Sequence, residues 1–167
     1  IFACIAAYFY LKKHQIPVLP FADTVTPGII LGQAIGRIAN FMNGDAFGHP
    51  TGQDFGLLYP DTTLAYHTYG AQPLWPAEVW ECQGDLLIFV LLLWYGCKTR
   101  TEGTTFCLYI MFYSLLRFFL ENYRGDYGTL ALGLKSAQLT SLAAFAGAFI
   151  LFLYFHFKHK SKSGISE

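Results

Sequence analysis

The sequence predicts an all-α integral membrane protein, a polytopic bundle of transmembrane helices with a long extracytoplasmic loop. Of its 167 residues, 54% are hydrophobic and only 13% are charged, about half the charged share of an ordinary soluble domain. The apolar residues lie in long runs, and a helix needs about 20 such residues to cross a bilayer. Basic and acidic residues number 11 each, so the composition lacks the positive charge typical of nucleic-acid-binding proteins.

Five apolar segments follow one another along a single predicted membrane domain, residues 1–167. The first, residues 1–11 (IFACIAAYFYL), is too short to span a bilayer. We therefore expect it to be part of a spanning helix, with further sequence upstream of Ile1. Stretches rich in Gly, Pro and polar residues separate the segments, and the longest of them, residues 44–77, is predicted to be an outer loop. The predicted complete spans are residues 21–42, 79–96, 105–123 and 136–157.

The lysines and arginines predict the orientation, because short cytoplasmic loops are enriched in both. Three basic clusters end the first, third and fifth segments, and segments that alternate in direction place all three clusters in the cytoplasm. The C-terminus is then cytoplasmic, residues 44–77 are outside, and Lys135 is the single lysine on the outer side. The three clusters are Lys12 with Lys13, Lys98 with Arg100, and Lys158 with Lys160 and Lys162.

The charged residues within the apolar segments gather at one depth, near the outer leaflet. Arg37 lies about 16 residues into its segment, roughly 24 Å along a helix axis. Arg117, Glu121 and Arg124 are also at the outer end of their segment, as are three acidic residues of the preceding one. Charge at membrane depth is costly and marks a functional site by default, and guanidinium groups suit phosphate. The three acidic residues are Glu78, Glu81 and Asp85, and we expect Glu81 and Asp85 to balance the arginines.

Structural explanations compete with the functional one. Gly28, Gly32 and Gly36 recur at every fourth residue, and close helix packing is the favoured explanation for them. It does not explain the polar stripe that follows them on the same helix. Glu78 is expected to face water at a helix entrance. The polar stripe consists of Gln33, Arg37 and Asn40.

The second charged helix allows a similar choice between structure and function. Arg117 and Glu121, four residues apart, can form an internal ion pair, while Arg124 can snorkel to the interface. For Arg124 the two explanations have equal weight. A pair alone is a poor reason to bury Arg117, because arginine at a helix centre costs about 2.5–3.5 kcal/mol on insertion.

Other motifs are absent or weak. The four cysteines have no paired spacing and are expected to be thiols. No metal-binding or nucleotide-binding pattern occurs, so we expect neither a metal nor a cofactor. His49 and His67 lie in the predicted outer loop, where a histidine is more often solvated than catalytic.

Residues 36–48, GRIANFMNGDAFG, resemble the signature of the prolipoprotein diacylglyceryl transferases, bacterial membrane enzymes that lipidate lipoprotein precursors. Asp45 stands where that family usually has Glu, and the segment LLRFFLENYRGD has Arg117, Glu121 and Arg124 in matching positions. A further segment, WPAEVWE, stands where the family usually has His-Pro-x-Gln-Leu-Tyr-Glu. In it Pro76 and Glu81 fit, while Trp75, Glu78 and Trp80 replace His, Gln and Tyr. The signature positions that fit are Gly36, Arg37, Ala39, Asn40, Phe41, Met42, Asn43 and Gly48.

The resemblance implies a reaction at the outer leaflet of the bacterial cell membrane. Phosphatidylglycerol supplies a diacylglyceryl group to the thiol of a lipobox cysteine in a prolipoprotein, and glycerol 1-phosphate leaves. Arg37 and Arg117 are then the expected catalytic phosphate clamp. The base is either a histidine in a His-Gly-Gly segment expected upstream of Ile1 or a carboxylate in this chain. The expected substrate-binding residues are Arg37 itself; Asn40, Asn43 and Asp45, which orient the headgroup; Glu121, which holds an arginine; and Gly48, Glu81 and Arg124.

Two alternatives belong to other functional classes. A non-catalytic lipid-binding or transport protein would use the same arginines to hold an anionic headgroup. A small structural or assembly subunit would use its charges only as packing pairs. The first alternative predicts binding without product, and the second predicts that Arg37→Ala lowers the yield of folded protein.

Overall fold

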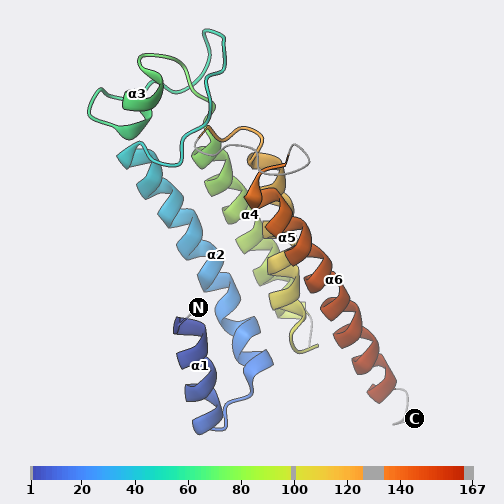
Figure 1. Ribbon diagram of the computed structural model, residues 1–167. Helices are drawn as coiled ribbons and strands as arrows, with labels where there is room; N and C mark the ends of the chain where they lie inside the picture. The colour runs from blue at the N-terminus through green and yellow to red at the C-terminus, as the bar shows by residue number, and fades with distance from the viewer. Residues whose placement is uncertain (1, 99–100, 126–133, 164–167) are drawn as a thin grey trace.

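The computed structural model describes residues 2–98, 101–125 and 134–163 (Figure 1). Arg100, used above to orient the chain, lies outside these ranges, and the side chains of Lys160 and Lys162 are outside the described part too. The described residues form helices and contain no strand, only isolated bridges, so the all-α prediction is confirmed for them. The helices are α1 (Phe2–Lys13), α2 (Val18–Asn43), α3 (Leu64–Tyr69), α4 (Ala77–Lys98), α5 (Thr104–Leu120) and α6 (Ser136–Ser163).

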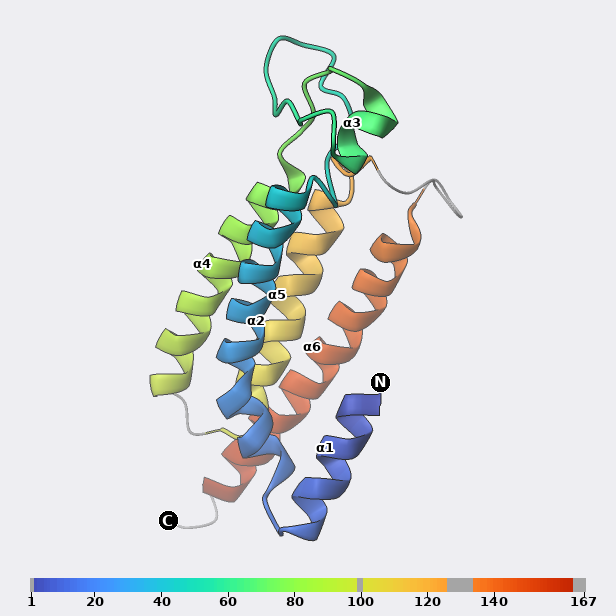
Figure 2. The ribbon, with the colours of Figure 1, turned by 90° about the vertical axis from the view of Figure 1, so that its left-hand side faces the viewer.

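The four long helices run side by side, with α3 and the rest of residues 44–76 at one end, called here the loop end (Figures 1 and 2). Helix α2 packs mainly against α4, α5 packs mainly against α6, and α4 joins the two pairs through α5. The last turns of α1, α4 and α6 lie at the end opposite α3. The basic residues Lys12, Lys98 and Lys158 are in or near these turns.

Helix α2 ends at the loop end because of a local signal. Gly44 follows Asn43 with a left-handed backbone (φ 69°), and its N–H donates to the carbonyls of Asn40 and Phe41. Glycine adopts this conformation without strain and commonly ends helices. A Cβ at Gly44 would also lie 2.5 Å from the Cβ of Thr63, which caps α3. One glycine therefore ends α2 and lets the loop pack against it.

The long helices expose apolar side chains and bury charged ones. Ile35, Leu87, Trp94 and Ile150 are among many large apolar residues that are more than half exposed. The fully buried side chains include several carboxylates, which water-soluble proteins almost never bury unpaired. An apolar exterior of this extent suits a protein surrounded by lipid. The fully buried carboxylates are Glu78, Glu81, Asp85 and Glu121.

Among the residues that the structure describes, two helices are long and apolar enough to cross a membrane by length and composition, Val18–Asn43 and Ser136–Lys158. Helix α5 is apolar but has 17 residues and ends at Leu120, three residues before the end of the predicted segment. Residues 121–123 form turns instead. The prediction that residues 105–123 are one helix was therefore wrong at its end, and Arg124 lies in the turn that follows α5.

Two further predictions were wrong. An ideal Cβ on Gly28, Gly32 or Gly36 would meet nothing within 4 Å, so in the described part of the chain these glycines do not pack against a helix. The close approach occurs instead at Gly84 of α4, where a Cβ would lie 2.5 Å from the side chain of Leu116 on α5. Glu78 is fully buried rather than water-facing, because α4 begins beneath the folded loop.

Candidate functional site

Glu81 on α4 is the centre of a cluster of positive charges at the loop end. Its Oε1 lies 2.8 Å from Nη2 of Arg37 on α2, and its Oε2 lies 3.3 Å from Nη1 of Arg117 on α5. Nη1 of Arg124, in the turn after α5, lies 3.5 Å from the same Oε2. The Glu81 side chain is fully buried. The structure thus brings together Arg37 and Arg117, the two arginines that the sequence analysis placed in a phosphate clamp.

A second carboxylate supports this cluster. Nη2 of Arg117 lies 3.0 Å from Oε2 of Glu121, one turn further along the chain. Arg117 therefore spans two carboxylates with its two terminal nitrogens, a geometry that a planar guanidinium allows and an ammonium does not. Nζ of Lys135 lies 4.0 Å from Oε1 of Glu121 and donates hydrogen bonds to the carbonyls of Glu121 and Arg124.

The three arginines differ in how much of each side chain remains exposed. Arg124 is 5% exposed, whereas Arg37 and Arg117 are 21% and 16% exposed. The latter two can therefore meet a ligand while they remain paired with Glu81. Arg117 also lines a cleft of about 340 Å³ between α5 and α6, together with Tyr113 and Thr140.

The loop residues close over Arg124. The backbone of Arg124 forms an isolated antiparallel bridge with Gly48. A Cβ at Gly48 would overlap the carbonyl oxygen of Trp75, so only glycine permits this approach. Gly48 is thus a packing residue that holds the loop against the turn carrying Arg124.

The polar residues of the signature have unequal places in the site. Oδ1 of Asn40 accepts a hydrogen bond of 3.5 Å from Nη1 of Arg37, so Asn40 belongs to the network. Asn43 ends α2 and is exposed, and Asp45 is half-buried in the following turn. In the described part of the chain, the side chains of Asn43 and Asp45 make no hydrogen bond or ion pair to the arginines.

Two further residues of the site were not identified from the sequence. The Tyr113 hydroxyl donates to Oε1 of Glu81 at 3.4 Å, and Tyr113 precedes Arg117 by one helical turn, a spacing that could have identified it. Lys135 was noticed only as the lone lysine on the outer side. A lysine on the outer side, where the orientation rule predicts few, could have indicated that Lys135 has a role in the site.

The departures Trp75 and Trp80 pack together. Their ring centroids are 5.6 Å apart, and each lies 5.3 Å from the ring of Tyr123, the residue before Arg124. The two tryptophans and Tyr123 thus form one aromatic cluster. Aromatic pairs of this kind stabilise a fold by about 0.5–1.5 kcal/mol beyond the contribution of buried area. The third departure, Glu78, is buried, and neither of its oxygens has a hydrogen-bond partner among the described residues.

The fold and the site together define an all-α membrane protein with a buried arginine–carboxylate centre. Comparison with known families is more specific. The prolipoprotein diacylglyceryl transferase family model matches residues 1–154. The chain belongs to this family.

Curated relatives agree with this assignment. The chain is 37% identical over 164 residues to the phosphatidylglycerol–prolipoprotein diacylglyceryl transferase of Clostridioides difficile, covering 98% of this chain and 60% of the relative. It is 35% identical over 161 residues to the enzyme of the same name from Corynebacterium efficiens, covering 89% of this chain and 50% of the relative. The chain therefore spans between half and 60% of the length of these relatives.

Proposed function

We propose that the protein containing this chain transfers a diacylglyceryl group from phosphatidylglycerol to the lipobox cysteine of prolipoproteins. The observation that carries the proposal is the convergence of Arg37, Arg117 and Arg124 on the single buried carboxylate of Glu81. Phosphatidylglycerol has an anionic phosphodiester, and the guanidinium groups of Arg37 and Arg117, which keep exposed surface, suit such an anion. The names of the relatives supply the substrates.

The proposed step is a displacement at carbon. The thiolate sulfur attacks the glycerol carbon that bears the phosphate ester, a carbon–sulfur bond forms, and the carbon–oxygen bond breaks. The bonding electrons leave with glycerol 1-phosphate, and the thiol proton passes to a base. Negative charge grows on the leaving phosphate, where fixed guanidinium groups stabilise it. A free thiol has a pKa of about 8.5, so positive charge nearby also favours the thiolate.

Within this proposal the residues have distinct tasks. Arg37 and Arg117 contact the phosphate, because both keep exposed surface while paired. Asn40, held by Arg37, orients the glycerol headgroup with Asn43 and Asp45. Glu81 and Glu121 hold the arginines in place, and Arg124 completes the charge around Glu81. Gly48 lets the loop close over the site.

A direct assay tests the proposal against simple lipid binding. The full protein in detergent or proteoliposomes is supplied with phosphatidylglycerol and a synthetic lipobox peptide, and the peptide mass is followed. The expected result is a gain of one diacylglyceryl unit that requires the peptide cysteine, with a Cys→Ser peptide as control. Headgroup binding with no modified peptide would instead support a non-catalytic lipid-binding protein, the alternative that the replacements Trp75, Glu78 and Trp80 favour.

We also propose that the chain is a multi-pass protein of the bacterial cell membrane, with α2, α4, α5 and α6 crossing the bilayer. The apolar exterior of these helices and the buried charges at one end support this proposal. The basic residues at the other end support a cytoplasmic C-terminus. Residues 44–76 and the arginine cluster then face the outer leaflet.

Thiol labelling of intact cells tests this orientation. Cys97, exposed near the end of α4, is expected to react with a membrane-impermeant maleimide only after the cells are permeabilised. A cysteine introduced at the exposed loop position Asp54 is expected to react without permeabilisation. Each measurement uses a background without other cysteines, and the buried Cys107 serves as a control for unreactive thiols. The reverse pattern would contradict the orientation.

A further inference from the structure

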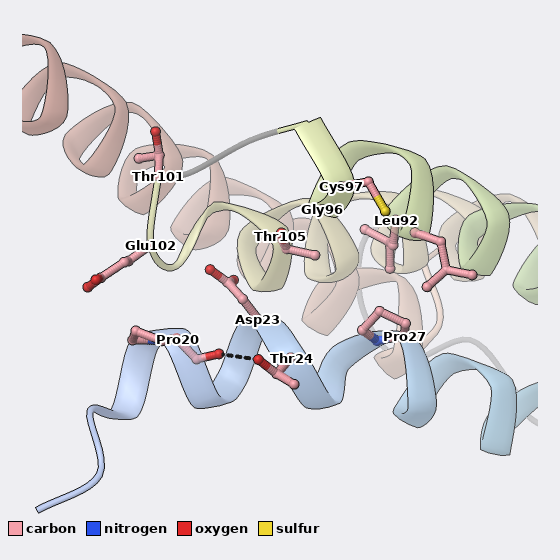
Figure 3. Close-up of a pocket in the computed structure, with 11 residues that line it drawn as sticks. Pro20, Asp23, Thr24, Pro27, Leu92, Gly96, Cys97, Thr101, Glu102 and Thr105 are labelled. Atoms are coloured by element: carbon pink, nitrogen blue, oxygen red, sulfur yellow. Dashed lines mark hydrogen bonds between the residues drawn. The ribbon is translucent and has the colours of Figure 1, made fainter.

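The end of the molecule opposite the loop contains a contact that the proposed chemistry does not use. Asp23, in the second turn of α2, points toward the start of α5 (Figure 3). Its Oδ2 accepts a hydrogen bond of 2.6 Å from the backbone N–H of Gly103, and its Oδ1 accepts one of 2.8 Å from the N–H of Phe106. Both carboxylate oxygens of Asp23 thus accept hydrogen bonds from backbone amides at the start of α5.

This contact serves as the N-terminal cap of α5. The first amides of a helix have no partner within the helix, and a side chain at the preceding residue usually accepts from one of them. The preceding residue here is Gly103, which has no side chain and makes no such bond. Asp23 supplies the cap from α2 instead, and its negative charge also suits the positive end of the helix dipole.

A cap supplied by a neighbouring helix holds two helices at one relative height. Helices α2 and α5 both run from this end toward the loop end. Arg37 lies 14 residues after Asp23, and Arg117 lies 14 residues after Gly103. At 1.5 Å per residue both arginines are about 21 Å from the contact. The equal spacing brings them to the same level, where each pairs with one oxygen of Glu81.

We propose that Asp23 is a positioning residue that sets the axial register of α2 against α5 and thereby aligns Arg37 with Arg117. The next residue, Thr24, does not share this role, since its hydroxyl donates to the carbonyl of Pro20 in its own helix (Figure 3). The structural part of the proposal concerns the two helices alone. Its catalytic consequence rests on the proposed transfer.

The catalytic test compares Asp23→Ala with two controls in the full protein. Displacement of a reacting group by about 1 Å can cost about 100-fold in rate, so Asp23→Ala is expected to lower kcat per folded molecule about 10- to 100-fold. The KM for phosphatidylglycerol is expected to change less, because either arginine alone still attracts the headgroup. Thr24→Ala, on the next residue, and Ile30→Val, in the buried core of α2, are expected to keep kcat per folded molecule.

Asp23→Asn separates positioning from simple stabilisation. Asparagine caps helices as well as aspartate does, but it has one acceptor oxygen and can serve only one of the two amides. Its kcat is therefore expected to fall between those of wild type and Asp23→Ala. A lower yield of folded protein with wild-type kcat per folded molecule, in either variant, would overturn the proposal.

A distance measurement tests the register without any activity. Spin labels on cysteines at Met42 and Phe119, both exposed near the loop ends of α2 and α5, report the relative height of the helices by double electron–electron resonance. Asp23→Ala is expected to shift or broaden the distance distribution, and Thr24→Ala is expected to leave it unchanged. Identical distributions in wild type and Asp23→Ala would refute the register role. Absence of transfer in the wild type would refute the proposed function and leave this measurement decisive for the register.

Discussion

Replacement of Glu81 by alanine is expected to cost about 3–5 kcal/mol of folding free energy and to abolish transfer. Removal of one partner of a buried ion pair leaves an uncompensated charge, and losses of this size are typical. Here one carboxylate is shared by Arg37, Arg117 and Arg124, so all three lose their common acceptor. Thermal unfolding of the purified protein in detergent and the peptide mass assay measure the two effects.

The chain offers a matched control for Glu81 three residues earlier on the same helix. Glu78 is equally buried, but its oxygens have no hydrogen-bond partner among the described residues. Glu78→Gln therefore removes a buried charge without breaking a direct ion pair, and it is expected to keep the fold. Glu81→Gln retains the shape of the side chain and lacks the charge. If Glu81→Gln unfolded at the same temperature as wild type and kept its activity, the central role of Glu81 would be wrong.

Replacement of Arg117 by alanine is expected to lower kcat about 100- to 1,000-fold, the cost of removing one preorganised donor from a developing charge. The fold is expected to survive, because Arg37 and Arg124 still neutralise Glu81 and Lys135 remains close to Glu121. Kinetics with a lipobox peptide and phosphatidylglycerol, normalised to folded protein, measure the loss.

Arg117→Lys tests the geometry of the same site. The ammonium keeps the charge but cannot span Glu81 and Glu121 as the two guanidinium nitrogens do. Most of the activity is therefore expected to be lost in this variant as well. Lys158→Ala, at the opposite end of α6, is the control for the loss of a positive charge. A wild-type kcat in Arg117→Ala would exclude Arg117 from the phosphate clamp.

Much of the fold was predictable because hydropathy and end signals are local properties. The predicted segment 21–42 lies within α2, and 79–96 lies within α4. The end of α5 was not predictable in this way, since residues 121–123 remain helical in composition. The carbonyls of Glu121 and Arg124 accept hydrogen bonds from Nζ of Lys135, eleven residues beyond that arginine. A contact between residues so far apart in the chain produces no periodic pattern in the sequence that could predict it.

The charged residues of the candidate site were predictable except for Lys135, whereas most of the contacts between them were not. Helical spacing places Arg37 and Arg117 at one depth, because rise per residue converts position into height. It does not say which side chains face each other. Glu81 was expected to balance the arginines together with Asp85, but its contact with all three arginines was not predicted. Tyr113 as a further donor to Glu81 and the burial of Glu78 were not predicted either. The absence of a packed neighbour at Gly28, Gly32 and Gly36 in the described part of the chain was not predicted for the same reason. A stripe of small residues permits close helix packing without requiring it.

The amino-acid order alone was enough to predict the long helices, an expected side of the membrane for each end, and the family signature around Arg37. Each of these depends on neighbours within a few turns of one chain segment. The pairing of three arginines with one carboxylate and the alignment of α2 with α5 emerged from the folded molecule. Both depend on contacts between residues 36 to 83 positions apart in the chain, which packing sets and local spacing does not encode.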